Sequence, residues 1–207
     1  MRKILIALAC LALAVTLTGT AQAQNAVPVV GPDDQILGKA DAPVTIIEYA
    51  SMTCPHCAAF ARDTLPKVRS EWIDTGKAKL VFRDFPLDRL ALAASVIAHC
   101  APTGRYYSFI ESFFDSQENW ARAADPIAAL KAIARLGGMN AETFDKCMSN
   151  VDLQQKVVDV EAKAKKDFGV DSTPTFFIES SNGSDKVVGE QSYENFDKVL
   201  TKALPKG

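Results

Sequence analysis

The feature that most constrains this chain is a pair of cysteines separated by two residues, Cys54-Pro55-His56-Cys57, called here the CPHC motif. An apolar run at residues 44–50 precedes the motif and predicts a strand, and a helical pattern begins at about Cys57. A strand that leads into a helix N-terminus places the first cysteine at the mouth of a site where backbone N–H groups and the helix dipole favour an anion. Because the thiolate is the nucleophile in disulfide exchange, the motif predicts dithiol/disulfide chemistry and a lowered pKa for Cys54.

The first 23 residues are expected to be a signal peptide. Two basic residues follow Met1, residues 4–17 form an uncharged apolar run, and residues 21–23 have the Ala-Gln-Ala pattern of a cleavage site. We therefore expect cleavage after Ala23 and export to the periplasm, a compartment in which disulfides form. A retained membrane anchor and lipidation at Cys10 are the alternatives, and the short apolar run and the cleavage pattern argue against them.

The remaining chain of roughly 180 residues suits one domain with a sizeable hydrophobic core. Without the two basic residues of the predicted signal peptide, 21 Lys and Arg stand against 25 Asp and Glu, a net charge near −4. No basic cluster appears, which argues against nucleic acid as a partner. Four cysteines remain, Cys54, Cys57, Cys100 and Cys147, and their even number in an exported protein predicts that none is an idle thiol.

The pattern along the chain predicts an α/β fold. Residues 24–38 contain several Pro and Gly residues and are expected to form an extended N-terminal arm with one short strand near residues 35–37. A helix is expected over residues 57–75, with a kink at Pro66, and a strand over residues 79–86. Because a helix connects this strand to the one before the cysteines, the two should be parallel through a right-handed crossover.

A block of helices is predicted before the last strands. Every pattern from residue 88 to residue 168 is helical, with apolar residues recurring at spacings of three and four. We then expect a strand at 175–179, a hairpin turn at 180–185, an antiparallel strand at 186–188 and a final helix at 193–204. An α/β sheet with an inserted helical subdomain accounts for this order.

Two features near the strands point to the same chemistry. Glu48 interrupts the apolar strand six residues before Cys54; buried beneath the cysteines, it would have a raised pKa and would accept a proton from Cys57. The alternative is a glutamate at a strand end that reaches water. Pro174 stands just before the third strand, where a cis peptide bond facing the cysteines would leave the backbone of Thr173 unpaired and able to hold an extended substrate. A trans proline in a loop is the alternative.

Together, the signal peptide, the Glu48 strand, the CPHC motif, the helical insertion and the segment from Ser172 to Ile178 resemble the DsbA-like branch of the thioredoxin superfamily, the periplasmic thiol:disulfide oxidoreductases of bacteria. The resemblance implies a thioredoxin-like fold over residues 39–207, with a helical insertion at about 88–168. It also implies that the chain introduces disulfides into exported proteins.

The resemblance implies roles for the residues of the motif. Cys54 would be the attacking cysteine that forms mixed disulfides, and Cys57 would resolve them. Pro55 and His56 would set the stability of the thiolate, and Glu48 would be the buried acid. No cofactor is expected beyond the redox-active cysteine pair.

The resemblance further implies that Pro174 is a cis proline beside the cysteines and that Thr173 before it helps to bind substrate. The best-known oxidases of the branch carry valine where Thr173 stands, and isomerase relatives also carry threonine, so a disulfide isomerase or reductase is the alternative activity. The isomerases have an N-terminal dimerisation domain, and residues 24–38 are too short to form one, which favours a monomeric oxidase.

The resemblance also implies partners for the protein and a second disulfide. Reduced exported proteins would be the substrates, and a quinone-linked, DsbB-like membrane protein would reoxidise the pair. Relatives with cysteines at places similar to Cys100 and Cys147 are expected to bond them; two buried free thiols are the alternative.

Other classes of protein fit the motif less well. Cys54, His56 and Cys57 offer three metal ligands, but structural zinc needs four and no second close pair exists. Covalent haem would require histidine where Ala58 stands. A redox-inert binding module held by two disulfides would not need Pro and His between the cysteines.

Overall fold

The computed structural model describes residues 26–205. The predicted signal peptide, residues 1–23, lies outside the described residues, as does the start of the predicted arm. The rest of the arm contains one short strand, β1 (Ile36–Gly38), close to the predicted position. Arg83 anchors the arm, because its guanidinium donates two hydrogen bonds to the Asp34 carboxylate and one to the carbonyl of Val29.

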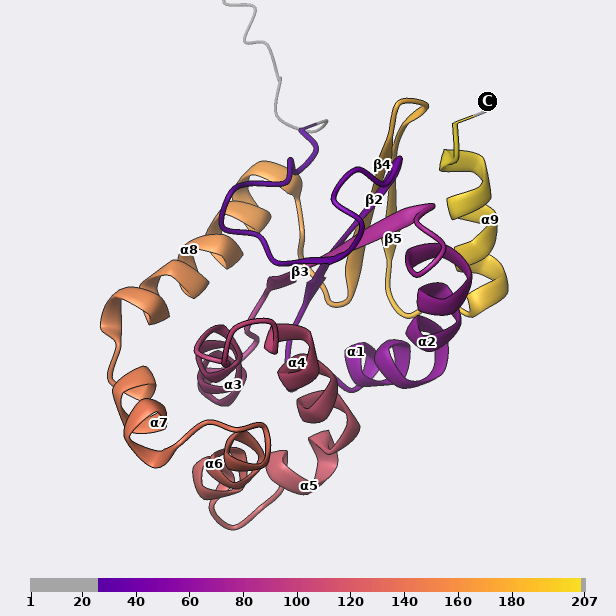
Figure 1. The fold of residues 1–207 in the computed structure, drawn as a ribbon. Helices are drawn as coiled ribbons and strands as arrows, with labels where there is room; N and C mark the ends of the chain where they lie inside the picture. Colours follow the sequence, from indigo (N-terminus) through magenta and orange to yellow (C-terminus); the bar gives the residue numbers. More distant parts are fainter. Residues whose placement is uncertain (1–25, 206–207) are drawn as a thin grey trace, which may run out of the picture.

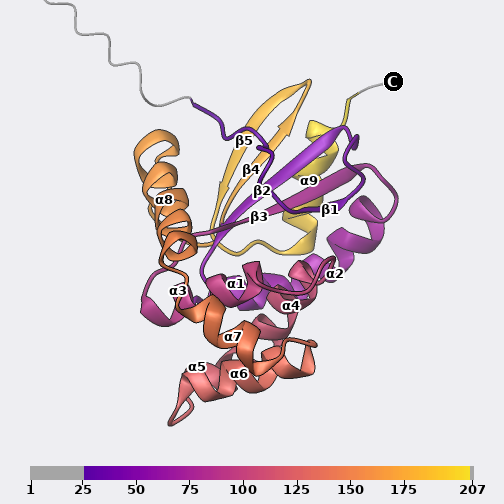
Figure 2. The ribbon, with the colours of Figure 1, turned by 60° about the vertical axis from the view of Figure 1, so that its left-hand side comes forward.

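The centre of the molecule is a five-stranded sheet in the order β1-β3-β2-β4-β5 (Figure 2). The other strands are β2 (Val44–Ala50), β3 (Ala78–Asp84), β4 (Thr175–Ser180) and β5 (Gly183–Val188). The predicted parallel pairing of β2 with β3 is confirmed, and β4 pairs antiparallel to β2 on its other side. Because β2 is central and buried on both faces, its end is a rigid platform for the motif that follows.

Helices cover both faces of the sheet. Alternate residues of β2 point to opposite faces, so Ile46 packs in the cluster with α9 (Tyr193–Ala203) and the helix after the motif, whereas Ile47 packs in the cluster with α8 (Val151–Phe168). Figure 1 shows α8 and α9 on opposite sides of the strands. The fold is the predicted thioredoxin-like α/β arrangement.

The helix after the motif begins at Pro55 rather than at Cys57, and it is not uniform. It runs through α1 (Pro55–Ala59), the π-helical segment η1 (Phe60–Thr64), α2 (Leu65–Val68) and a second π-helical segment, η2 (Arg69–Ile73). Pro66 has no N–H group to donate and its ring crowds the preceding turn. The π-helical segment η1, whose turn is wider than an α turn, ends two residues before Pro66.

The helical insertion lies between β3 and β4 (Figure 1). Its helices before α8 are α3 (Arg89–His99), α4 (Tyr106–Asp115), α5 (Gln117–Ala121), α6 (Pro126–Leu136) and α7 (Ala141–Met148). Side chains of Asp88, Asp125, Asn140 and Asn150 accept N–H bonds at the starts of α3, α6, α7 and α8. The short helix α5 was not predicted separately. Gly169, at φ 60°, ends α8 in the left-handed conformation that glycine adopts at little cost.

The predicted hairpin is present, but its turn is much shorter than expected. Ser180 pairs with Gly183, so the turn is only two residues long and β5 begins at Gly183 rather than at Lys186. The polar residues Ser184 and Asp185, which suggested a loop, lie on an edge strand where polar side chains reach solvent.

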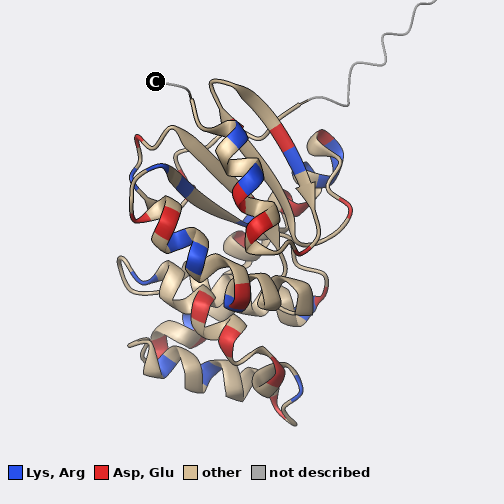
Figure 3. Cartoon of the chain, turned by 90° about the vertical axis from the view of Figure 1, so that its right-hand side faces the viewer, with Lys and Arg blue, Asp and Glu red and all other residues tan. Residues whose placement is uncertain are grey.

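Figure 3 shows basic and acidic residues intermixed on the helices of this side of the molecule, with no large region of one sign. Within residues 26–205, none of the helices combines the length and the apolar character that crossing a membrane requires.

Candidate functional site

The CPHC motif lies where β2 ends and α1 begins. Cys54 is the N-cap of α1, with φ −77° and ψ 120°, and Pro55 occupies the first helical turn, where its fixed φ suits the helix and its missing N–H is not needed. Cys57 follows inside the helix. The structure holds the two cysteines as free thiols.

The Cys54 sulfur is surrounded by hydrogen-bonding groups. Its thiol donates to the Thr173 carbonyl over 3.3 Å. Hydrogen bonding to the sulfur, most strongly from the Cys57 thiol and also from the N–H groups of residues 56 and 57, outweighs burial and lowers the pKa of Cys54 from 9.0 to about 5. Cys54 is only 5% exposed, less than the sequence suggested, because the segment before Pro174 lies against it.

Cys57 has the opposite character. It is fully buried, and burial raises its pKa well above 9.0, with further contributions from the neighbouring Cys54 sulfur and from Glu48. The sulfurs of two cysteines that are three positions apart along the chain are thus held in opposite protonation states at neutral pH. One is a ready nucleophile and leaving group, and the other is a protonated thiol.

Glu48 is buried inside the sheet, which was one of the two predicted alternatives. It is 2% exposed, and its cross-strand neighbours are Phe82 on β3 and Phe176 on β4. Burial raises its pKa to about 8, with a smaller contribution from the charge of Cys54. Its Oε1 atom has no hydrogen-bond partner within residues 26–205. A carboxyl group with this pKa is protonated at neutral pH and able to exchange a proton with a nearby thiol.

The peptide bond between Thr173 and Pro174 is cis, which was one of the two predicted alternatives. The Pro174 carbonyl accepts a 2.8 Å hydrogen bond from the N–H of Gly189, so this turn is joined to the loop before α9. The sequence predicted an unpaired Thr173 backbone. Its carbonyl instead faces the Cys54 sulfur, whereas its N–H has no hydrogen-bond partner in the described part of the chain.

His56 is exposed at the mouth of the site, and its Nδ1 atom lies 3.2 Å from Oε2 of Glu190. Glu190 belongs to the loop between β5 and α9, and a second contact joins this loop to the helix after the motif, because the Thr64 hydroxyl donates to the carbonyl of Gln191. No pattern in the sequence indicated Glu190, which lies 134 positions from His56 along the chain.

Two further contacts hold the loop that leads into the motif. The Thr53 hydroxyl donates to the carboxylate of Asp88, which also caps α3. The side-chain amide of Gln117 donates to the carbonyls of Met52 and Cys54. Both partners come from the helical insertion, which therefore packs against the motif, and neither was among the predicted site residues.

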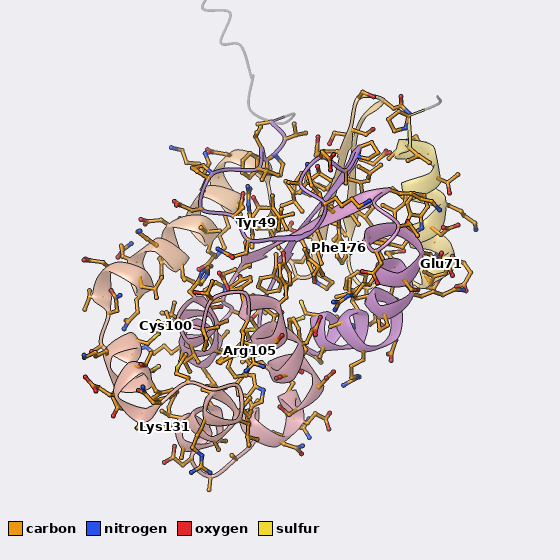
Figure 4. All side chains as sticks on the ribbon, viewed as in Figure 1. Tyr49, Glu71, Cys100, Arg105, Lys131 and Phe176 are labelled. Atoms are coloured by element: carbon orange, nitrogen blue, oxygen red, sulfur yellow. A yellow bond between two sulfur atoms is a disulfide. The ribbon has the colours of Figure 1, made fainter. Side chains whose placement is uncertain are left out.

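Cys100 and Cys147 form a disulfide with a Cα–Cα distance of 6.2 Å. It joins the end of α3, near the Cys100 label in Figure 4, to α7. Within residues 26–205, no group of three or more His, Cys, Asp and Glu side chains is placed to hold a metal ion.

The fold and the cysteine pair define a thioredoxin-fold protein with a dithiol site, and comparison with known proteins gives the family. The family model described as "Thioredoxin" matches residues 31–202. The crystal structure of alpha-DsbA1 from Wolbachia pipientis superposes with a TM-score of 0.77 at 33% identity and covers 84% of this chain and 92% of that chain. The chain belongs to the thioredoxin family, in its DsbA-like branch of protein-disulfide oxidoreductases.

Curated relatives agree. A putative protein-disulfide oxidoreductase of Rickettsia prowazekii is 30% identical over 83% of this chain, and the chain spans 62% of the length of that relative. Disulfide bond formation protein D of Bacillus subtilis is 26% identical over 79% of this chain and 72% of its own length.

Proposed function

We propose that this chain is a periplasmic thiol:disulfide oxidase that introduces disulfides into exported proteins through the CPHC pair. The observation that carries the proposal is the opposite character of the two sulfurs: a low pKa for Cys54 and a high pKa for Cys57. A stabilised thiolate exists only in the reduced form of the pair. It therefore favours the reduced form and makes the disulfide form a stronger oxidant.

The first step is attack on the oxidised pair. A substrate thiolate attacks the Cys54 sulfur, the bond between Cys54 and Cys57 breaks, and a mixed disulfide forms between the substrate and Cys54. Cys57 leaves as a thiolate with a high proton affinity, so it takes up a proton. Glu48, which is protonated at neutral pH, donates that proton and is reprotonated from solvent.

The second step releases the product. A second substrate thiolate attacks the substrate sulfur of the mixed disulfide, and Cys54 leaves as a stable thiolate. The substrate gains a disulfide, and the pair gains two electrons. A low pKa makes Cys54 a good leaving group. In the reverse direction Glu48 accepts the proton of Cys57 when that thiol resolves the mixed disulfide.

Substrate would bind along the cis-proline turn. The free N–H of Thr173 can donate to a carbonyl of an extended peptide that adds as a strand, which would place a substrate cysteine beside Cys54. Pro174 holds this turn, and Pro55 and His56 tune the stability of the thiolate from the start of α1.

The cycle needs an oxidant for the reduced pair. We assign this role to a quinone-linked, DsbB-like membrane protein whose own disulfide is attacked by Cys54. The signal-peptide pattern of residues 1–23 supports a periplasmic location. We assign a structural role to the disulfide between Cys100 and Cys147. We expect the protein to act as a monomer.

The proposal is tested by comparing oxidation with reshuffling. The oxidised protein is mixed with a reduced, unfolded test protein, and the reduced protein with a scrambled one. We expect rapid loss of free thiols from the first test protein and slow recovery of native pairing in the second. The reduction potential of the pair should lie well above the value of about −270 mV that is typical of thioredoxin.

The variant Cys54→Ser is the inactive control. A potential near that of thioredoxin, together with efficient reshuffling and no net oxidation, would contradict the proposal and favour a reductase or an isomerase.

A further inference from the structure

Gln117 reaches the active-site loop from the helical insertion. It is the first residue of α5, and it is only 6% exposed. Its side-chain nitrogen donates two hydrogen bonds of 2.9 Å, one to the carbonyl of Met52 and one to the carbonyl of Cys54. The side-chain amide of Gln117 thus donates to two main-chain carbonyls. These carbonyls belong to the residues on either side of Thr53, more than 60 positions before Gln117 in the sequence.

The two carbonyls belong to the segment in which strand becomes helix. Met52 is fully buried. The Cys54 carbonyl also accepts the N–H of Ala58 over 3.2 Å at the start of α1. Gln117 therefore fixes the peptide group between Cys54 and Pro55 and the one between Met52 and Thr53, and so holds the segment that carries the Cys54 side chain. Without these donors, buried carbonyls would lose hydrogen bonds, and the loop would be free to turn them towards other partners.

The geometry of Cys54 matters because its sulfur depends on several directional contacts. With φ −77° and ψ 120° it stands at the N-cap of α1, within reach of the Cys57 thiol and of the N–H groups of residues 56 and 57, which stabilise its thiolate. A rotation of this residue would weaken those contacts together. In addition, the Gln117 amide offsets the negative end of the Cys54 carbonyl dipole.

We propose that Gln117 is a positioning residue for the nucleophile, an inference that rests on the proposed function. Gln117 holds the loop at Met52 and Cys54, so that the Cys54 sulfur stays among the groups that stabilise its thiolate. The helical insertion thereby takes part in setting the oxidising power of the pair. Gln117 touches neither sulfur nor substrate in this assignment.

Two variants remove the donors in different ways. Gln117→Met keeps a side chain of similar length without hydrogen-bond donors or charge, and Gln117→Glu keeps the shape but presents acceptors to the two carbonyls. Gln154 provides a matched control, because its side-chain amide donates to the Met148 carbonyl over 2.9 Å, within the insertion and away from the motif. Gln154→Met and Gln154→Glu make the same chemical changes there.

Each variant is measured in three ways: the pH dependence of Cys54 alkylation, the equilibrium with a glutathione buffer, and thermal unfolding of the oxidised form. Both Gln117 variants should lower the alkylation rate near pH 4, below the pKa of Cys54, by about tenfold, because the fraction of thiolate falls. The equilibrium constant for oxidising a substrate should fall by a similar factor, a shift of about 30 mV towards a weaker oxidant. The Gln154 variants should change neither quantity.

A merely structural role predicts a different result. If both Gln117 variants unfold at lower temperature while the pH profile and the glutathione equilibrium match the parent protein, the inference is wrong. If Gln117→Glu does not fold, Gln117→Met decides the question alone. A parent protein whose Cys54 titrates near 9 would instead refute the proposed function, so the two failures are distinguishable.

Discussion

Burial controls the chemistry of Glu48. Its pKa of about 8 arises first from loss of water around the carboxylate, because Phe82 and Phe176 flank it across the sheet. At neutral pH the group is therefore a neutral acid. In the proposed mechanism, Glu48 gives this proton to the buried Cys57 thiolate. The transfer moves one negative charge from Cys57 to Glu48, so the two groups are never charged together.

The same burial predicts a pH dependence of stability. Between pH 4.5 and about 8 the folded protein keeps the Glu48 proton while the unfolded chain has lost it, so the free energy of unfolding falls as pH rises. The slope from this group is at most about 1.4 kcal/mol per pH unit. Glu48→Gln should remove it, and the variant should gain stability relative to the parent as pH rises through this window.

Denaturant unfolding of the disulfide form is the measurement, because Cys54 then does not titrate. Parallel stability curves for the parent and the variant from pH 4.5 to 8 would show that Glu48 is not a desolvated carboxyl group.

The residues that carry chemistry were predictable because they are close together in the sequence or stand in telling contexts. The CPHC motif and Glu48 share one strand, loop and helix, and Pro174 stands before a strand. Gln117 and Glu190 were not predictable. Their partners are 63 to 65 and 134 positions away, and a polar residue in a helix or a loop is ordinary until the fold brings it to the cysteines.

The helical insertion is held together by its own covalent link. The bond between Cys100 and Cys147 closes a loop of 47 residues and joins α3 to α7. Cys147 packs with Val96 and Val157 in a small cluster, and Cys100 packs against both this cluster and the larger one that contains Cys54 and Cys57. None of the groups that set the pKa of Cys54 belongs to the disulfide, so we expect the disulfide to support the insertion without tuning the redox pair.

Replacing both cysteines, Cys100→Ala with Cys147→Ala, should lower the free energy of unfolding by about 4 kcal/mol in the chain-entropy model. The pH profile of Cys54 alkylation should stay that of the parent protein. Chemical denaturation and alkylation kinetics on the same preparations check both parts. An unchanged stability, or a displaced pH profile, would contradict this division of roles.

The elements illustrate where patterns in the sequence suffice. Most helices of the insertion have a capping side chain and an apolar stripe, so a block of helices was predictable between the second and third predicted strands of the sheet. The π-helical segments were not, because apolar spacing does not distinguish an α turn from a π turn. The early start of β5 was missed because an edge strand tolerates the polar residues that usually mark a loop.

The whole molecule works by surrounding one sulfur with parts of the chain that are distant in sequence. β2 delivers the motif, α1 supplies N–H groups, the cis-proline turn supplies Thr173, and the insertion closes the site from the other side. The order of strands and helices predicted this architecture. The groups that contact the Cys54 sulfur, and their combined effect on its pKa, could be identified only from the assembled fold.

The central claim is that the Cys54 sulfur is a thiolate at neutral pH, and titration of the reduced protein tests it most directly. Thiolate ultraviolet absorbance, followed as a function of pH and checked by alkylation rate, should show a single cysteine with a pKa of about 5, while Cys57 stays protonated up to alkaline pH. A first cysteine that titrates near the ordinary value of 9.0 would contradict the account.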